Sequence, residues 1–430
     1  KKKIEQGLMP SAAFDLALLI HRNVRYAQPF ICKGSRENCD RRCEISIIEM
    51  DGKKYPFGGA CNKYYNLQHG LSYDTEALDL VTRRQMLIFD KYAASPGDGF
   101  TKGRIGFNRS FLTHTYYPLY STFFAELGYE RVLVNSCLQT GIDEKDASFC
   151  YPAELSHGFF YALLHETNRP DYIFLPHFKA LPNDGSANDS QVCPFVQGET
   201  FYLQSTFRKD IANLAKEGTK LLSPLLDLTD GLKSMEKPLC TAAKNMGITK
   251  TKAREAFRIA LQKQRACFAE MQELGLKALA DLEDHPNDIA VVIFGRAYSG
   301  LASEANKGIP RMLASRGYRV IPLDFLPLDS EPMKKHMYWG TGQQIMKAAT
   351  FVQKHPQLFG AYITNFSCGP DSFLLTYFRD TMGSKPSLTL ELDSHTAGAG
   401  LETRIEAFLD VIAAYRQLLS RNLLLTAKIR

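Results

Sequence analysis

Residues 288–294, Asp288-Ile-Ala-Val-Val-Ile-Phe294, form a continuous apolar run that is followed at once by Gly295-Arg-Ala-Tyr-Ser-Gly300. A short apolar run bounded by glycine is typical of a strand that is buried on both faces of a parallel sheet. The turn after it resembles a phosphate-binding turn but lacks the strict dinucleotide spacing. We therefore expect a buried strand whose carboxyl end leads into a loop facing an anion or a substrate.

Strands and helices alternate on both sides of this run. Alternation at this spacing predicts right-handed βαβ units and parallel sheets. The strands are expected at residues 104–107, 131–134, 171–176, 319–323, 360–365 and 387–392, and the helices at 116–127, 152–165, 309–316 and after Gly400. Residues 205–285 are rich in leucine, alanine, lysine and glutamate, and we expect helices almost throughout.

The predicted fold class is α/β, with two Rossmann-like parallel-sheet domains, a helical segment between them and a small N-terminal cysteine-rich segment. The N-terminal segment is expected to hold a helix at 11–22, a strand at 44–50, a hairpin across Asp51-Gly52 and a helical run at 75–92. The breaker cluster at 95–99 is a linker candidate. The predicted domains are residues 1–100, 101–204, 205–286 and 287–430.

Composition narrows the class of protein. The chain has 430 residues and is 45% hydrophobic, which is ample for several cores. Its 52 basic and 46 acidic side chains give a net charge of +6, too mild and scattered to predict nucleic-acid binding. No apolar run approaches the roughly 18 residues of a membrane span, and no signal-peptide h-region follows the first lysines. We expect a cytoplasmic protein in which the ten cysteines are not disulfides.

Seven of the cysteines are placed as metal ligands would be. Cys39, Cys43 and Cys61 form a local group, whereas Cys137, Cys150, Cys193 and Cys368 follow apolar runs or lie beside proline or glycine, where strands end. Thiolates gathered from such loops suit an iron–sulfur cluster. The alternatives are structural zinc in the local group, with a fourth ligand such as Cys32, and buried thiols. Cys240 and Cys267 lie in predicted helices and are explained as small hydrophobes.

The segment Asn365-Phe-Ser-Cys-Gly-Pro-Asp-Ser372 shows the pattern most clearly. A strand ends, a thiol follows, glycine allows close backbone approach and proline begins a helix. The same geometry suits a cluster ligand or a nucleophilic cysteine at a helix N-terminus. On the helix after Cys150, Glu154 and His157 are candidate proton donors, although a buried histidine satisfied by its neighbours explains the second equally well.

Together these motifs resemble a family. The chain is similar to the region that follows the ATPase domains in large CoA-enzyme-activase-related proteins, and to the 2-hydroxyacyl-CoA dehydratase and benzoyl-CoA reductase superfamily, which includes the double-cubane cluster proteins. The resemblance extends from Cys39 to about Asp410. It is carried by Gly103-Arg-Ile-Gly-Phe-Asn, Tyr117-Pro, Phe123-Phe-Ala-Glu-Leu-Gly128, Cys150-Tyr-Pro-Ala-Glu-Leu-Ser-His-Gly158, Cys193-Pro, Gly295-Arg-Ala-Tyr and Cys368-Gly-Pro-Asp-Ser372.

The resemblance implies an oxygen-sensitive cluster, either a 4Fe–4S cubane or a double-cubane 8Fe–9S cluster. The electrons would come from an actin/Hsp70-type ATPase activase that carries its own cluster, fused upstream or separate, and the protein would form a homodimer. The implied ligands are Cys39, Cys43, Cys61, Cys150, Cys193 and Cys368. Relatives often have a further cysteine where this chain has Arg36, so Cys32 would have to substitute in a four-cysteine site.

The function that we predict is an ATP-dependent iron–sulfur oxidoreductase component that reduces a small substrate, with His157 and Glu154 supplying protons. Two alternatives stay open. One is a 2-hydroxyacyl-CoA dehydratase-type subunit, which requires a cavity long enough for a CoA arm. The other is a binding or scaffold module held by structural zinc.

Overall fold

The structure is a computed structural model that describes residues 23–33, 42–59, 61–95, 102–145, 150–183, 185–396 and 398–429. Contacts group the chain into two compact units, residues 1–74 and 75–430. The predicted helix at 11–22, Cys39 and most of the breaker cluster at 95–99 lie outside the described residues. The four-part domain division stays a prediction.

The smaller unit contains a three-stranded antiparallel sheet in the order β1-β2-β3, followed by a short helix. The predicted hairpin is present, and Asp51 and Gly52 both have positive φ, at 51° and 78°, as a tight two-residue hairpin turn requires. The elements are β1 (Val24–Ile31), β2 (Glu44–Met50), β3 (Lys53–Phe57) and α3 (Lys63–His69).

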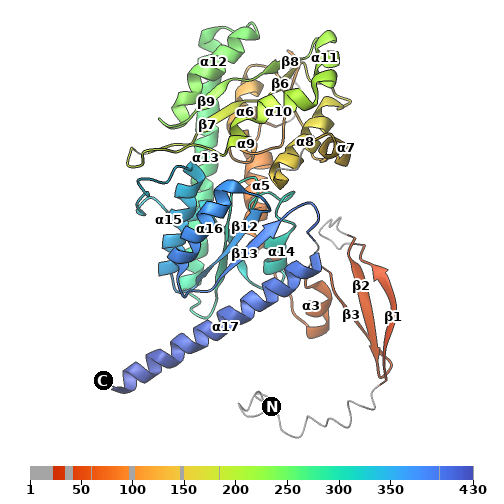
Figure 1. The fold of residues 1–430 in the computed structure, drawn as a ribbon, viewed down its shortest axis with the longest axis vertical. Helices are drawn as coiled ribbons and strands as arrows, with labels where there is room; N and C mark the ends of the chain where they lie inside the picture. The colour runs from red at the N-terminus through yellow and green to blue at the C-terminus, as the bar shows by residue number, and fades with distance from the viewer. Residues whose placement is uncertain are drawn as a thin grey trace. The chain divides into compact units, whose positions relative to one another are not determined.

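The larger unit is built on two four-stranded parallel sheets, in agreement with the predicted α/β class (Figure 1). The first has the order β5-β4-β6-β8 and the second β11-β10-β12-β13. We call residues 102–228, which contain the first sheet, the first lobe, and residues 289–412, which contain the second, the second lobe. The strands are β4 (Arg104–Phe107), β5 (Glu130–Leu133), β6 (Tyr172–Phe174), β8 (Lys220–Leu222), β10 (Ala290–Phe294), β11 (Arg319–Pro322), β12 (Leu358–Asn365) and β13 (Ser387–Leu392).

The two sheets share one topology. In each, the strand that comes first in sequence lies second in the sheet. The next strand in sequence lies on one side of it and the third strand on the other side, so the strand order reverses between the first and third strands. Ligands of open α/β sheets bind outside the carboxyl ends of the strands at this switch point. The residues that follow β4, β6, β10 and β12 are therefore the first place to look for a site.

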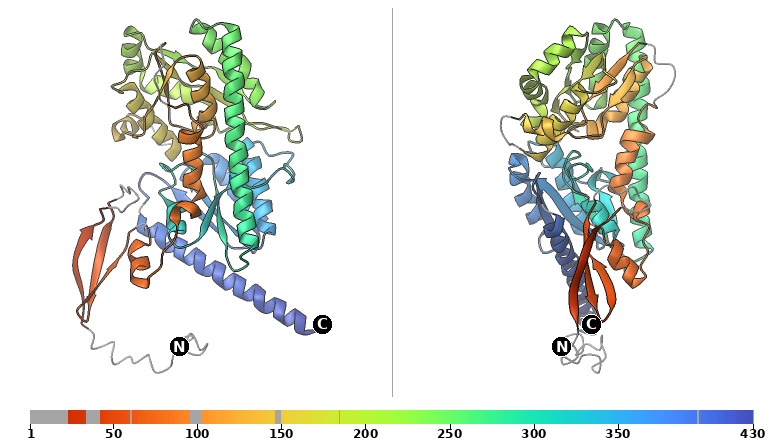
Figure 2. Two further views of the ribbon diagram at one scale, coloured as in Figure 1. Left: turned by 180° about the vertical axis from the view of Figure 1, so that it is seen from behind. Right: turned by 90° about the vertical axis from the view of Figure 1, so that its right-hand side faces the viewer.

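Helices cover the sheets and connect the lobes. Figure 2 shows the long helix α13 (Lys250–Glu283) running along both lobes, where it packs on α6 in the first and against the short helix η4 in the second. The other helices of the larger unit are α4 (Thr75–Leu78), α5 (Leu80–Met86), the π-helix η2 (Leu87–Lys91), α6 (Thr113–Glu126), α7 (Gln139–Asp143), α8 (Tyr151–Leu164), α9 (Pro194–Gln197), α10 (Glu199–Thr206), α11 (Arg208–Lys216), η3 (Leu232–Met235), α12 (Glu236–Asn245), α14 (Ile309–Ala314), η4 (Leu323–Phe325), α15 (Gly340–Lys354), α16 (Gly369–Met382) and α17 (Gly398–Ile429).

Burial of the central strands matches their apolar sequence. Every residue of β10 and β12 is buried, because helices lie on both faces of the second sheet. In the first lobe, Phe107 at the end of β4 packs edge-on against Tyr117 and Phe174, with ring centroids 5.5 and 6.0 Å apart. None of the helices among the described residues is long and apolar enough to span a membrane.

The expectation of helices almost throughout residues 205–285 is wrong for residues 220–227. Here β8 completes the first sheet, and β9 (Leu225–Asp227) pairs in parallel with β7 (His177–Ala180). The leucine-rich sequence favours helix by propensity, but Pro224 has no N–H to continue one, and Tyr172–Phe174 offers a free strand edge. Tertiary pairing therefore decides the structure of this segment.

Gly275 allows α13 to lie directly on η4. A Cβ at this position would be 1.8 Å from the carbonyl oxygen of Phe325, which is backbone and cannot rotate away. We expect Gly275→Ala to lower the free energy of unfolding by about 1–3 kcal/mol, the usual cost of overpacking. Urea denaturation followed by circular dichroism measures the change.

Gly400 is the matched control for this substitution, because it also lies in a helix but a Cβ there would meet nothing within 4 Å. Gly400→Ala should be neutral or slightly stabilising, since alanine favours helix. Equal effects of the two substitutions would contradict the close approach of α13 and η4.

Candidate functional site

The turn after β10 holds the centre of the site. Gly295 has φ 137°, and a Cβ there would be 2.6 Å from the carbonyl oxygen of Ile363 on β12. Only glycine fits this approach. The turn places the next residue, Arg296, between the carboxyl ends of β10 and β12, where its side chain is 3% exposed.

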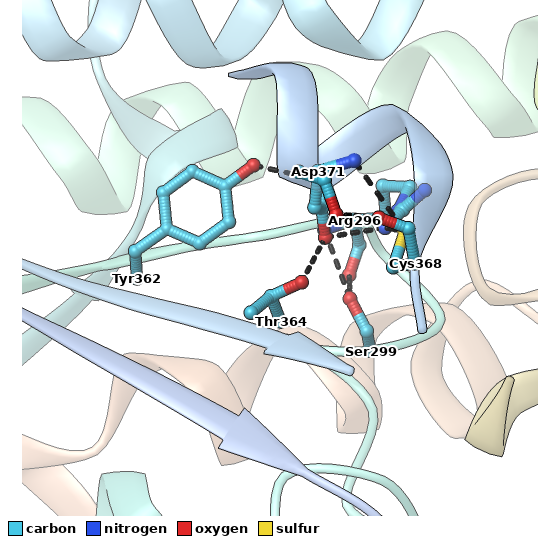
Figure 3. Close-up of polar contacts among 7 residues, drawn as sticks. Arg296, Ser299, Tyr362, Thr364, Cys368 and Asp371 are labelled. Atoms are coloured by element: carbon cyan, nitrogen blue, oxygen red, sulfur yellow. Dashed lines mark hydrogen bonds and ion pairs between the residues drawn. The ribbon is translucent and has the colours of Figure 1, made fainter. Parts of the chain in front are cut away.

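Arg296 contacts the N-terminus of α16 (Figure 3). Its Nη2 donates to the carboxylate of Asp371 and to the Sγ of Cys368, the latter over 2.6 Å. Asp371 also accepts hydrogen bonds from the Tyr362 hydroxyl at 3.0 Å and the Thr364 hydroxyl at 2.5 Å. Cys368 is the N-cap residue of α16, and its sulfur faces the backbone N–H of Asp371 at 3.5 Å. Strand end, thiol and helix start follow one another as the sequence predicted.

Charge and burial compete at these groups. Burial alone would lower the pKa of Arg296, but Asp371 and Cys368 raise it well above its ordinary value, so the guanidinium stays charged. Burial raises the pKa of the Cys368 thiol, although Arg296 opposes the rise. The thiol is therefore protonated when nothing binds it, and a metal that binds it must displace the proton.

Two further cysteines of the larger unit come to the same region. Cys150 is the N-cap of α8 and Cys193 the N-cap of α9, both at the carboxyl edge of the first sheet and both followed within two residues by a proline. Burial raises the pKa of Cys150 to about 12, and Arg296, Cys193 and Cys368 also act on it electrostatically. The structure thus places Cys193 of the first lobe and Cys368 of the second lobe each within electrostatic reach of Cys150. We call Cys150, Cys193 and Cys368 the three-cysteine site.

The structure also tests whether an iron–sulfur cluster suits this site. Among the described residues, no three His, Cys, Asp or Glu side chains lie close enough to share a single metal ion. Thiolates that bind different irons of one cluster are spaced more widely than the ligands of one ion. Three donors in this region are buried and make no hydrogen bond of ordinary geometry within the described part of the chain: Arg296 Nε, Asn365 Nδ2 and the Tyr202 hydroxyl. Cluster sulfur atoms accept hydrogen bonds, so these donors fit such a group.

The described cysteines of the local group lie together in the smaller unit. The Cys32 N–H donates to the Cys43 carbonyl at 2.8 Å, and the Tyr64 hydroxyl donates to Cys32 Sγ at 3.4 Å. Burial raises the pKa of Tyr64 to about 12, with further contributions from Cys32, Cys61 and Cys43. Cys32 therefore lies beside Cys43 in this unit, and its role as a fourth ligand stays a prediction. The predicted six-cysteine ligand set stays a prediction.

The predicted proton donors lie on α8. The His157 ring is buried, faces the Ala153 carbonyl at 2.7 Å through Nδ1 and stacks on Tyr202 at 5.2 Å. The Glu154 side chain contacts a different residue, and one of its carboxylate oxygens is 3.8 Å from Lys145 Nζ. Their catalytic role stays a prediction. Cys137 packs behind the same helix, where its thiol donates to the Leu155 carbonyl at 3.6 Å.

Sequence reasoning missed a buried carboxyl group, Glu199, at the start of α10. Its Oε1 accepts hydrogen bonds from Ser156 at 2.8 Å, from Asn108 at 3.0 Å and from Ser110. Burial raises the pKa of Glu199 to about 7, and the three donors moderate the rise. Its partners are up to 91 residues away in sequence, so only the folded topology reveals the group.

A cavity of about 450 Å³ opens on the other side of Arg296. Its walls are mostly apolar and come from both lobes and from α13. They also include a partly buried ion pair, Arg84 with Asp324, whose Nε and Oδ2 atoms are 2.8 Å apart. Its volume is in the range of pockets for small molecules. Arg296 therefore borders both the three-cysteine site and a cavity of substrate size.

Comparisons with known proteins agree with the resemblance. The family model described as CoA enzyme activase uncharacterised domain (DUF2229) matches residues 104–326, which include β4 to η4. No curated protein matches the chain. A solved structure, the C-terminal domain of glucosamine-fructose-6-phosphate aminotransferase from Francisella tularensis, is 11% identical over 80% of this chain and 96% of that chain, with a TM-score of 0.21. At that TM-score the likeness carries no argument.

Removing Asp371 tests the buried ion pair. Asp371→Ala leaves Arg296 charged, buried and without its carboxylate, and such losses cost about 3–5 kcal/mol of the free energy of unfolding. Glu236→Ala is the control, because the ion pair of Glu236 with Arg254 is exposed on both sides and should contribute little. Urea denaturation at pH 7 compares the two variants, and similar small losses in both would contradict the arrangement.

Stability should depend on pH through Glu199. Its pKa is about 7 in the folded protein against an ordinary value of 4.5, so folding favours the protonated carboxyl. The stabilisation is complete below pH 4.5, falls as pH rises and is lost above about pH 7, a total of about 3 kcal/mol. Glu199→Gln cannot ionise and should lack this decline. Urea denaturation from pH 5 to 8 measures it, and parallel curves for the two proteins would show that Glu199 does not titrate in this range.

Proposed function

The chain belongs to the CoA enzyme activase uncharacterised domain family, and we propose that it is the iron–sulfur component of an ATP-driven reductase. One observation carries the proposal: of three helix-capping cysteines, Cys193 of the first lobe and Cys368 of the second each lie within electrostatic reach of Cys150. When bound there, a cluster would accept and release single electrons. The cofactor would be a 4Fe–4S cubane or a double-cubane cluster.

The surrounding residues support this role. Arg296 carries a positive charge against the Cys368 sulfur and would stabilise its thiolate, while Asp371 holds the guanidinium in place. The donors on Tyr202 and Asn365, which make no hydrogen bond of ordinary geometry among the described residues, would hydrogen-bond to cluster sulfur and so raise its reduction potential. The adjoining cavity, which Arg296 borders, would hold a small substrate.

The family also supports a proposal for the partner. The electrons would come from an actin/Hsp70-type ATPase activase with its own cluster, and the functional protein would be a homodimer. The word activase in the family description, and the cavity bordered by Arg296, keep a dehydratase-type subunit as the second candidate. That candidate would bind an acyl-CoA in this cavity.

Iron analysis tests the proposal. We expect protein purified without oxygen to contain about four irons per chain for one cubane, or about eight for two, with matching acid-labile sulfide. Cys150→Ser, Cys193→Ser and Cys368→Ser should each lose most of the iron of the three-cysteine site. Cys267→Ser is the matched control, because Cys267 is fully buried in the middle of α13 and should leave the iron unchanged.

The same assay on Cys43→Ser examines the local group. Loss of all iron in both Cys43→Ser and Cys368→Ser indicates one shared cluster, whereas partial loss in each indicates separate sites. Zinc without iron in the unsubstituted protein would contradict the proposal and leave the structural zinc module.

A further inference from the structure

Two arginines, Arg84 and Arg296, line the cavity of about 450 Å³, and guanidinium groups ordinarily bind anions. The sequence points the same way, because the turn at residues 295–300 resembles a phosphate-binding turn. In the structure, however, carboxylates of the protein itself already bind both guanidinium groups. The charge of the cavity therefore depends on these carboxylates as much as on the arginines.

Arg84 is paired within the cavity wall. Its side chain, on α5, is 1% exposed, and its Nε donates to Oδ2 of Asp324 at 2.8 Å. A second nitrogen, Nη1, donates to the His114 carbonyl at 3.0 Å. Asp324 lies on η4 and lines the same cavity, where its side chain is 30% exposed. Both members of the ion pair thus belong to the wall, and together they have no net charge.

Arg296 is paired in the same way. Its Nη2 donates to the Asp371 carboxylate and to Cys368 Sγ, and the side chains of Arg296 and Asp371 are only 3% and 1% exposed. The charged side chains among the described residues of the wall are Arg84, Arg296 and Asp324. With Asp371 included, two arginines are balanced by two aspartates. An anion entering the cavity would have to compete with a carboxylate for either guanidinium.

The rest of the wall suits a hydrocarbon group. It is mostly apolar, and the rings of Tyr116 and Phe268 meet there edge to face, with centroids 6.5 Å apart. The neutral polar side chains of the wall are Thr115, Gln272, Thr341 and Gln344. Such groups hydrogen-bond to a carbonyl or an amide without adding charge. A bound anion would lose its water and gain no uncompensated positive charge in the described wall, which is unfavourable.

We propose that this cavity selects an uncharged, largely hydrocarbon molecule with a carbonyl-type polar group, and that Asp324 sets this selectivity by neutralising Arg84. The inference deepens the proposed function and rests on it in treating the bound molecule as the substrate. In a dehydratase-type subunit, only the acyl part of an acyl-CoA would enter, and the phosphates would stay outside. Without the Asp324 carboxylate, the Arg84 guanidinium becomes a binding group for an anion.

Two probes of the same shape measure the preference: 3-phenylpropanamide, which is neutral, and 3-phenylpropanoate, which is an anion at pH 7. Isothermal titration calorimetry on protein purified without oxygen, with its iron content measured, should show the amide binding at least about 10-fold more tightly, the scale of one unpaired buried charge. Leu232→Trp enlarges a half-buried residue of the wall and should weaken amide binding by about 10-fold or more.

Asp324→Asn tests the source of the selectivity. The anion should bind about 10-fold more tightly to this variant than to the unsubstituted protein, because Arg84 then lacks its carboxylate. Asp281→Asn is the matched control, since Asp281 pairs with Arg319 at 2.8 Å and neither residue is in the described wall. It should leave both affinities unchanged.

A paired variant, Arg84→Met with Asp324→Leu, removes both charges of the wall pair and also serves if Asp324→Asn does not fold. It should keep the preference for the amide, because apolar residues often replace an ion pair without loss of stability.

The outcomes distinguish this inference from the proposed function. Binding of the anion as tight as that of the amide in the unsubstituted protein overturns the inference, as does no binding of either probe. An unchanged preference in Asp324→Asn, a lost preference in the paired variant, or full amide binding by Leu232→Trp also overturns it. Protein without iron overturns the proposed function, yet amide preference that Asp324→Asn reduces still supports the assigned ligand class.

Discussion

The contact of the Arg296 guanidinium with Asp371 and Cys368 is the constraint on which the site depends. It joins the turn after β10 to the helix after β12, across the switch point of the second sheet. The contact needs glycine at position 295, since any side chain would collide with β12. Buried ion pairs seldom add net stability, because desolvation offsets the attraction. This pair therefore serves to fix geometry, holding one positive charge against a cysteine that begins a helix.

The two lobes contribute different groups to the site around this fixed charge. The second lobe contributes Arg296 and Cys368, and the first contributes Cys150, Cys193, Tyr202 and the buried Glu199. Burial raises the pKa of the Cys150 and Cys368 thiols, so the proposed binding of iron there would release their protons. Charges in such a buried region affect one another strongly, because the local dielectric is low.

Much of this arrangement follows from the sequence, and the rest depends on topology. The strands at 44–50 and 387–392 have the predicted bounds, because apolar runs and turn residues mark them locally. The cysteine-proline and cysteine-glycine-proline pattern predicts the helix-capping thiols for the same reason. In contrast, β8 is leucine-rich and becomes a strand only by pairing with β6, and Glu199 meets Asn108 only because two switch-point segments converge. No local signal marks either feature.

The common strand order of the two sheets explains why the thiols come from separate lobes. At a switch point, only the few residues that directly follow the strand ends can face a ligand. Because α13 packs on both lobes, the carboxyl edge of the first sheet is held near that of the second. A ligand set divided between the lobes, as proposed, would make cluster binding depend on how the lobes are placed. It follows that loosening α13 at Gly275 should weaken the proposed metal binding as well as folding, because the same helix packs on both lobes.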